Sequence, residues 1–301
     1  MRTVREGVIL LLLCSAAGQA WALDRKEVDK IVADHMSKIR TTVGMPYINP
    51  EISALEPHLL LDALKPYQED ESEVVRSTAY DIAWVVGRDS KDPAIRQEVV
   101  TRLLTGRDAW ARNSHSVLSF RRADFTDEAK QIVRALMQKD TPSSDIVLVA
   151  GIAEVQEAIP KLKALAGGDW RERPAWYRTT GWDALRALAR MGDKNAIQEC
   201  VEKVKTNPEV WLLGAMLNDL EYIRQPEAVA LIVKYLNSDE MMPRPDGRPG
   251  GARFSMSALL QLCRMIKDFP VRDNGTGFYA DADVESARTW MREHKDYEII
   301  R

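Results

Sequence analysis

Cysteine is scarce in this sequence of 301 residues, which contains only three. So few cysteines exclude a disulfide framework, because two or three thiols cannot staple a chain of this length. Aromatic residues make up 7% of the chain, and glycine (16) and proline (14) are also few, which argues against a turn-rich all-β protein. A hydrophobic fraction of 45% argues equally against a disordered chain. The composition is that of an ordinary globular protein.

Positive charge is not in excess either. The 42 Lys and Arg residues face 45 Asp and Glu residues, which gives a net charge of −3. A protein that reads nucleic acid normally carries surplus Lys and Arg to neutralise phosphates. We therefore expect no nucleic-acid partner.

Motifs that carry chemistry are absent from the sequence as well. The four histidines stand at no metal-ligand spacing to one another or to a cysteine, and no His-Glu dipeptide occurs. No nucleophile-elbow or phosphate-loop motif is found. We therefore expect no enzyme activity, no bound metal and no cofactor. Two weaker patterns remain. The Arg- and Gly-containing loop over 244–253 is interpreted as a connector, with an anion site as the alternative, and the acidic run 273–285 is interpreted as a turn before a helix, with a calcium site as the alternative.

Only the N-terminus carries a long apolar run. Two arginines precede an apolar stretch over 8–18, and the tripeptide Ala-Trp-Ala ends at Ala22. This order predicts a secretory signal peptide over 1–22 that is cleaved after Ala22. A permanent anchor is the weaker alternative, because the apolar stretch is about half as long as a spanning helix. We expect the mature chain to be periplasmic or secreted, with no integral membrane span.

Helical periodicity dominates the rest of the chain. Apolar residues recur at spacings of three and four, which places them on one face of successive helices. Small apolar pairs recur too, at intervals of 29 to 38 residues when a looser match at Ala129 is included. The pairs are Ala94-Ile95, Ala158-Ile159, Ala196-Ile197 and Ala228-Val229. Two helices in each unit of thirty-odd residues predict an all-α fold of the α-solenoid type.

One of these units, Ala187–Ile197, reads Ala-Leu-Ala-Arg-Met-Gly-Asp-Lys-Asn-Ala-Ile. It resembles the HEAT-like repeat of phycobilisome bilin lyases, in which an apolar helix end is followed by Gly-Asp, two variable residues and Ala-Ile-Pro. Another unit contains that proline at Pro160, and 70–76 matches the acidic, Val-Arg start of such repeats. The resemblance covers 55–237 and implies a right-handed α-solenoid of stacked antiparallel helix pairs, here as a secreted member of the family.

The ends of the chain depart from the repeat. We expect an N-terminal cap helix and connector over 23–54, HEAT-like repeats over 55–239, and a Gly/Pro-rich loop with a C-terminal helical cap over 240–301. The helix at 227–236 is apolar nearly all round. We expect it to lie buried beneath the cap helix at 283–300, with an exposed partner-binding patch as the alternative.

Tryptophan is concentrated in one short stretch, which contains Trp170, Trp176 and Trp182. Trp182 is in register with apolar residues three and seven positions later, so we expect it in the core. Trp176 falls off that stripe, and tryptophan and arginine contribute much of the energy of protein interfaces. We expect Trp176 to contact a partner, with a ring folded over the inter-repeat loop as the alternative. The candidate partner-binding residues are Arg173, Trp176, Arg178, Gln198, Glu199, Glu202 and Lys203.

These features predict a non-catalytic protein-binding scaffold of the periplasm or cell exterior, which uses the curved surface of the solenoid to hold another protein. Two alternatives stay open. One is an enzyme or accessory factor resembling bilin lyases, although a signal peptide is hard to reconcile with lyases that act on cytosolic proteins. The other is a carbohydrate or small-ligand binder that uses the aromatic side chains of 170–182.

Overall fold

The computed structural model is helical throughout the part of the chain that it describes, which comprises 23–41, 50–106, 114–172, 175–207, 212–242, 253–274 and 277–300. These segments contain no strand, only two isolated bridges, Met241–Arg253 and Ile266–Ile299. The predicted all-α class is confirmed. The predicted signal peptide and Arg173 lie outside the described residues. None of the described helices combines the length and apolar character needed to cross a membrane.

The chain folds as two compact units, 1–111 and 112–301. The repeat pattern in the sequence runs across this boundary and does not indicate it. In the first unit, α4 packs against α2 and α5, and α5 packs against α6. The described helices of this unit are α2 (Arg25–Thr41), α3 (Pro50–Ser53), α4 (Pro57–Gln68), α5 (Glu73–Asp89) and α6 (Pro93–Thr105).

Local sequence explains where these helices begin and which face they bury. Glu56 and Asp92 accept backbone N–H groups at the N-termini of α4 and α6, and a proline follows each of them at the first helical position. On α2, Val28, Val32 and Ile39 are buried at helical spacing, as the sequence pattern predicts.

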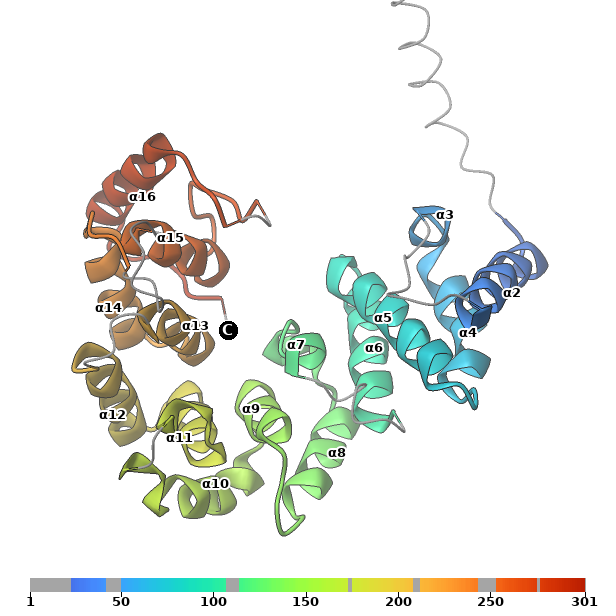
Figure 1. Cartoon of the computed structure of the whole chain (residues 1–301), viewed down its shortest axis with the longest axis horizontal. Coiled ribbons are helices and arrows are strands. Elements are labelled where there is room, and N and C mark those ends of the chain that lie inside the picture. Colours follow the sequence, from blue (N-terminus) through green and yellow to red (C-terminus); the bar gives the residue numbers. More distant parts are fainter. Residues whose placement is uncertain are drawn as a thin grey trace, which may run out of the picture. The chain divides into compact units, whose positions relative to one another are not determined.

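The helices of the second unit lie in two rows (Figure 1). Helices α9, α11, α13 and α15 contact one another in turn and form one row, whereas α12, α14 and α16 form the other. From α11 onward, successive helices belong to alternate rows and pack on each other. Helix α11 packs on α12 and also on α10, and α13 packs on α12 and α14. The helices are α7 (Ser114–Val117), α8 (Asp127–Met137), α9 (Ser144–Ala153), α10 (Ile159–Ala166), α11 (Thr180–Arg190), α12 (Lys194–Lys205), α13 (Leu213–Ile223), α14 (Pro226–Leu236), α15 (Phe254–Met265) and α16 (Asp281–Glu293).

Two helices of this unit are apolar almost all round because neighbours cover several of their faces. Helix α9 contacts α7, α8 and α11, and every residue from Ile146 to Ala153 is buried. Helix α14 contacts α12, α13, α15 and α16, and it buries residues such as Val229 and Ile232. The predicted burial of α14 beneath the last helix is therefore confirmed.

Candidate binding site at the tryptophan cluster

Three tryptophan rings pack together where two short 3-10 helices, η4 (Asp169–Glu172) and η5 (Trp176–Arg178), lead into α11. The ring centroids of Trp176 and Trp182 are 4.7 Å apart with an interplanar angle of 85°, an edge-to-face arrangement. Trp170 lies 6.0 Å from Trp182 and 6.3 Å from Trp176. Trp182 is 0% and Trp170 3% exposed, whereas Trp176 is half-buried. The predicted core position of Trp182 is confirmed, and Trp176 is the ring of the three that solvent reaches.

Polar groups and one glycine hold the cluster in place. The indole N–H of Trp170 donates to the carbonyl of Ala166 at 2.9 Å, and that of Trp182 donates to Oδ2 of Asp219 at 2.9 Å. Both buried indoles therefore have a hydrogen-bond partner, as rings of this kind require. A Cβ atom at Gly181 would overlap the Trp170 ring. Glycine at this position lets the ring pack against the first turn of α11.

Helix α12 presents a polar face beside this cluster. Asp193 caps the helix by accepting the backbone N–H groups of Asn195 and Ala196. One face of α12 is buried through residues such as Ile197 and Cys200. The other face borders a shallow depression of about 440 Å³, which is lined by Asn195, Gln198, Glu199, Glu202, Lys203 and Thr206. Four of these six are residues that the sequence predicts for the partner-binding surface.

Two contacts join the cluster to α12. The ammonium group of Lys203 lies 5.2 Å from the ring centroid of Trp176, within cation–π range. The guanidinium of Arg171 donates two hydrogen bonds to the carboxylate of Glu199, at 2.6 and 3.0 Å, in the bidentate geometry that fixes both groups. The half-buried indole and the depression therefore form one surface. We call it the tryptophan surface and define it as Trp176, Gln198, Glu199, Glu202 and Lys203.

Only one of the two predicted arginines lies among the described residues. Arg173 lies outside the described residues. Arg178 is exposed, and its guanidinium lies 5.4 Å from the ring centroid of its neighbour Tyr177. Among the described residues no hydrogen bond or ion pair joins it to α12. The sequence does not single out Arg171, although it stands in the same tryptophan-rich stretch. Its pairing with Glu199 depends on the fold.

Two groups beside the tryptophan surface have raised pKa values. The hydrogen bond to Glu199 raises the pKa of Arg171, so this guanidinium stays charged at neutral pH. Burial raises the pKa of the nearby Cys200 thiol well above its usual value, which makes it a poor nucleophile. No group of three or more metal-ligating side chains occurs among the described residues. No protein-family model matches this chain, and no curated protein or solved structure is significantly similar to it.

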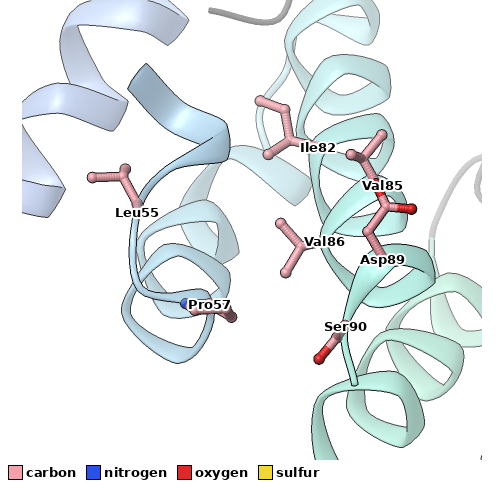
Figure 2. Close-up of a pocket in the computed structure, with 7 residues that line it drawn as sticks. All are labelled: Leu55, Pro57, Ile82, Val85, Val86, Asp89 and Ser90. Carbon is pink, nitrogen blue, oxygen red and sulfur yellow. The ribbon is translucent and has the colours of Figure 1, made fainter. Parts of the chain in front are cut away.

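A smaller pocket in the first unit is apolar. It has a volume of about 210 Å³ and lies between the turn before α4 and the last turns of α5 (Figure 2). Its one carboxylate belongs to Asp89, which Arg88 pairs at 2.7 Å. The side chains that line it are Leu55, Pro57, Ile82, Val85, Val86, Asp89 and Ser90. We assign no function to this pocket, because its charged group is already paired.

The described residues of the acidic run 273–285 lead into α16, in agreement with the predicted helix start. The side chain of Asn274 donates to the carbonyl of Phe278 at 2.6 Å and accepts the N–H of Gly277 at 3.2 Å. Asp283 caps the start of α16 by accepting the N–H of Ala280 at 2.9 Å. Most of the 244–253 loop lies outside the described residues; Arg253, at its end, pairs with Asp281.

Proposed function

We propose that this protein is a non-catalytic scaffold of the periplasm or cell exterior that binds another protein through the tryptophan surface. The observation that carries the proposal is a half-buried indole next to an open depression lined by six polar side chains. Interfaces commonly place one large aromatic side chain among polar neighbours, and the aromatic contributes most of the binding energy.

We further propose that the helices stack as a HEAT-like α-solenoid. Support comes from the second unit, where helices of one row contact each other in turn and alternate along the chain with those of the other row. In such folds, function depends on the residues that each repeat exposes. Helix α12 exposes polar residues on one face and buries apolar residues on the other, as a helix on the binding surface of a solenoid would.

The rings favour a protein partner over a carbohydrate. A sugar-binding platform stacks its ligand on exposed aromatic faces, but Trp170 and Trp182 are 3% and 0% exposed. Trp176 alone is open, and Lys203 already lies against its ring. The depression beside it is shallow, whereas small ligands are normally held in enclosed sites.

Replacing Trp176 with alanine tests this proposal. We expect W176A to weaken partner binding by about 2 kcal/mol or more, because the variant removes the central aromatic contact. The protein would be immobilised and exposed to envelope extract from its native host, and captured proteins would be identified by mass spectrometry. The matched control is W84A, which removes another half-buried indole, from α5, that also has a cation over its ring, Arg88 at 4.9 Å.

The supporting result is a near-stoichiometric partner that the wild type and W84A retain and W176A loses. Thermal melts monitored by circular dichroism would show that W176A still folds. Equal capture by all three proteins, or no reproducible partner, would contradict the proposal.

A further inference from the structure

A second site lies on the other row of helices. A cavity of about 460 Å³ is lined by residues of α9, α11, α13 and α15, and α12 contributes nothing to it. Four arginines but only two carboxylates line this cavity. The arginines are Arg186, Arg190, Arg224 and Arg264.

Three of these arginines have carboxylate partners. Arg186 pairs with both Asp183 and Asp219. The guanidinium of Arg264 donates to Asp273 at 2.7 Å. Arg224 is 3.5 Å from Glu221 and donates to the carbonyl of Ile300 at 2.8 Å. Pairing of this kind offsets the desolvation cost of a buried guanidinium.

Arg190 is different, because no carboxylate of the described residues lies within 4 Å of its guanidinium. The side chain is only 8% exposed. It donates from Nη1 to the carbonyl of Tyr222 and lies 5.2 Å from the centroid of that ring. Burial lowers the pKa of Arg190 to about 10, so the group remains charged at neutral pH.

Most N–H donors of Arg190 make no hydrogen bond within the described residues. A guanidinium carries five N–H donors, and the bond to Tyr222 occupies one of them. The fully enclosed and unsatisfied nitrogens of this region are the Nε atoms of Arg186 and Arg224, and no nitrogen of Arg190 is among them. Arg190 lines the cavity, and its remaining donors are accessible rather than enclosed.

Besides the charged groups, aliphatic side chains line the cavity. Leu118, Leu148 and Ile152 line the same cavity, and Leu148 and Ile152 are buried in the core. A ligand that satisfies the whole cavity therefore needs an anionic group and an apolar part. The planar fork of a guanidinium matches a carboxylate through two parallel N–H···O hydrogen bonds.

We propose that this cavity binds a small organic carboxylate, whose charged group contacts Arg190 and whose apolar part lies against Leu148 and Ile152. This site is independent of the tryptophan surface, so either proposal can fail alone. The rival role for Arg190 is purely structural, since its bond to Tyr222 satisfies a carbonyl in the last turn of α13. A structural role requires no ligand.

Calorimetric titration with 4-methylpentanoate at neutral pH tests the proposal, with 4-methylpentanamide as an uncharged ligand of the same shape. We expect the acid to bind saturably to the wild-type chain and the amide to bind at least about tenfold more weakly. Arg190→Gln should weaken binding of the acid by at least about tenfold. Arg134→Gln is the control and should bind normally, because Arg134 is an exposed arginine paired with Glu157 at 3.3 Å.

A third ligand distinguishes two sources of the carboxylate. If N-acetyl-glycyl-leucine binds at least about tenfold more tightly than 4-methylpentanoate, the cavity takes the C-terminus of a polypeptide; otherwise it takes a free acid. No saturable binding up to about 10 mM, or equal binding of acid and amide, would overturn the proposal. So would unchanged affinity in a folded Arg190→Gln variant. The comparison of acid with amide uses wild-type protein and stands even if that variant fails to fold.

Discussion

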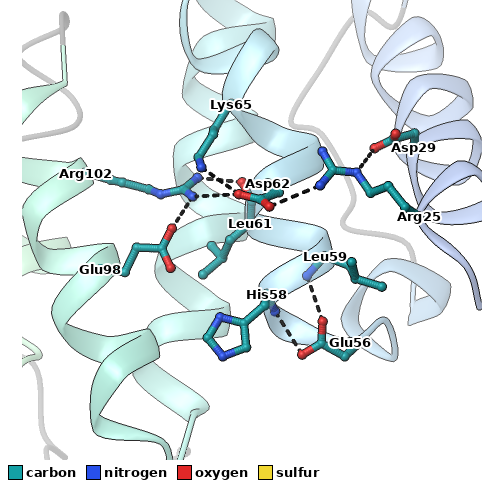
Figure 3. Close-up of polar contacts among 10 residues, drawn as sticks. All are labelled: Arg25, Asp29, Glu56, His58, Leu59, Leu61, Asp62, Lys65, Glu98 and Arg102. Carbon is teal, nitrogen blue, oxygen red and sulfur yellow. Dashed lines mark hydrogen bonds and ion pairs between the residues drawn. The ribbon is translucent and has the colours of Figure 1, made fainter. Parts of the chain in front are cut away.

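Each unit of the chain contains a cluster of basic and carboxylate side chains, and the two clusters differ in burial. In the first unit, Asp62 accepts hydrogen bonds from Arg25 at 3.1 Å and from Lys65 at 2.6 Å (Figure 3). Arg102 lies 3.8 Å from the same carboxylate, and Arg25 also binds Asp29. Each of these cations has a carboxylate within 4 Å, and the side chain of Asp62 is 41% exposed.

In the second unit Arg186, Arg190 and Arg224 are mostly buried, whereas Arg264 is 41% exposed, and the four arginines are unevenly paired. Arg186 has two carboxylates, whereas Arg190 has none among the described residues. An exposed ion pair contributes about 0–1 kcal/mol, so the first cluster needs no role beyond solubility and local order. Burying an unpaired charge costs several kcal/mol. Buried and unbalanced charge, rather than a large number of ion pairs, therefore marks the better candidate for a ligand-binding site.

The largest expected effect comes from breaking the buried cluster. Arg186→Met leaves Asp183 and Asp219 without their shared partner, and we expect a loss of about 3–5 kcal/mol in the free energy of unfolding. Asp62→Asn, in the exposed cluster, should cost less than about 1 kcal/mol. Urea denaturation of both variants measures the contrast. Similar losses in the two variants would show that burial does not separate the clusters.

The pH dependence of stability should also differ between the clusters. Burial raises the pKa of Asp219 to about 6, although Arg186 and the hydrogen bond from Trp182 oppose the shift. The hydrogen bond from Lys65 lowers the pKa of Asp62. Between pH 3.8 and about 6, Asp219 is therefore protonated in the folded chain but ionised in the unfolded chain, where its pKa is 3.8. The stability that Asp219 contributes is present below pH 3.8 and is lost as pH rises to about 6, whereas that of Asp62 is lost as pH falls.

Comparison of the wild type with Asp219→Asn at pH 4.5 and 6.5 isolates this effect. The free energy of unfolding of the wild type, relative to that of the variant, should be greater at pH 4.5 than at pH 6.5, because the variant lacks the titrating group. The charged groups that face Asp219 are Arg186 and Asp183 from α11, and Asp219 in turn raises the pKa of the buried Cys200 thiol on α12. A difference that does not change between the two pH values would contradict the raised pKa.

Salt should produce the smallest effect. At about 1 M salt the Debye length is about 3 Å, so exposed charges are screened and buried pairs much less so. We expect the small cost of Asp62→Asn to vanish in 1 M NaCl, while the cost of Arg186→Met persists. Urea denaturation at low and high salt is sufficient, and an equal salt response of both variants would argue against the buried position of Arg186.

Periodicity predicted much of the local structure. It placed Trp182 in the core from the apolar face of its helix, and it predicted the burial of α14 because that helix is apolar nearly all round. It did not indicate the boundary between the two units, since the helices on either side follow the same pattern. Sequence also named Trp176 and Lys203 as candidates, but only the fold brings residues 27 positions apart to 5.2 Å.

The arginine cavity could not be foreseen in the same way. Arg186 and Arg190 are four residues apart on α11, a spacing that normally indicates a solvated helix face. Packing of α9 and α13 against α11, with Arg264 of α15 lining the same cavity, turns that face into an interior. The one available signal is that α11 is otherwise rich in small apolar residues, which leaves little room for an exposed side.

The most direct test of the proposed binding role is photo-crosslinking in the native host. A photoreactive amino acid at Gln198, an exposed residue of the tryptophan surface, would be compared with one at Glu128, an exposed residue of α8. We expect the Gln198 position to crosslink one discrete protein and the Glu128 position to give none. Crosslinking from Glu128 alone, or the same products from both positions, would contradict binding through the tryptophan surface.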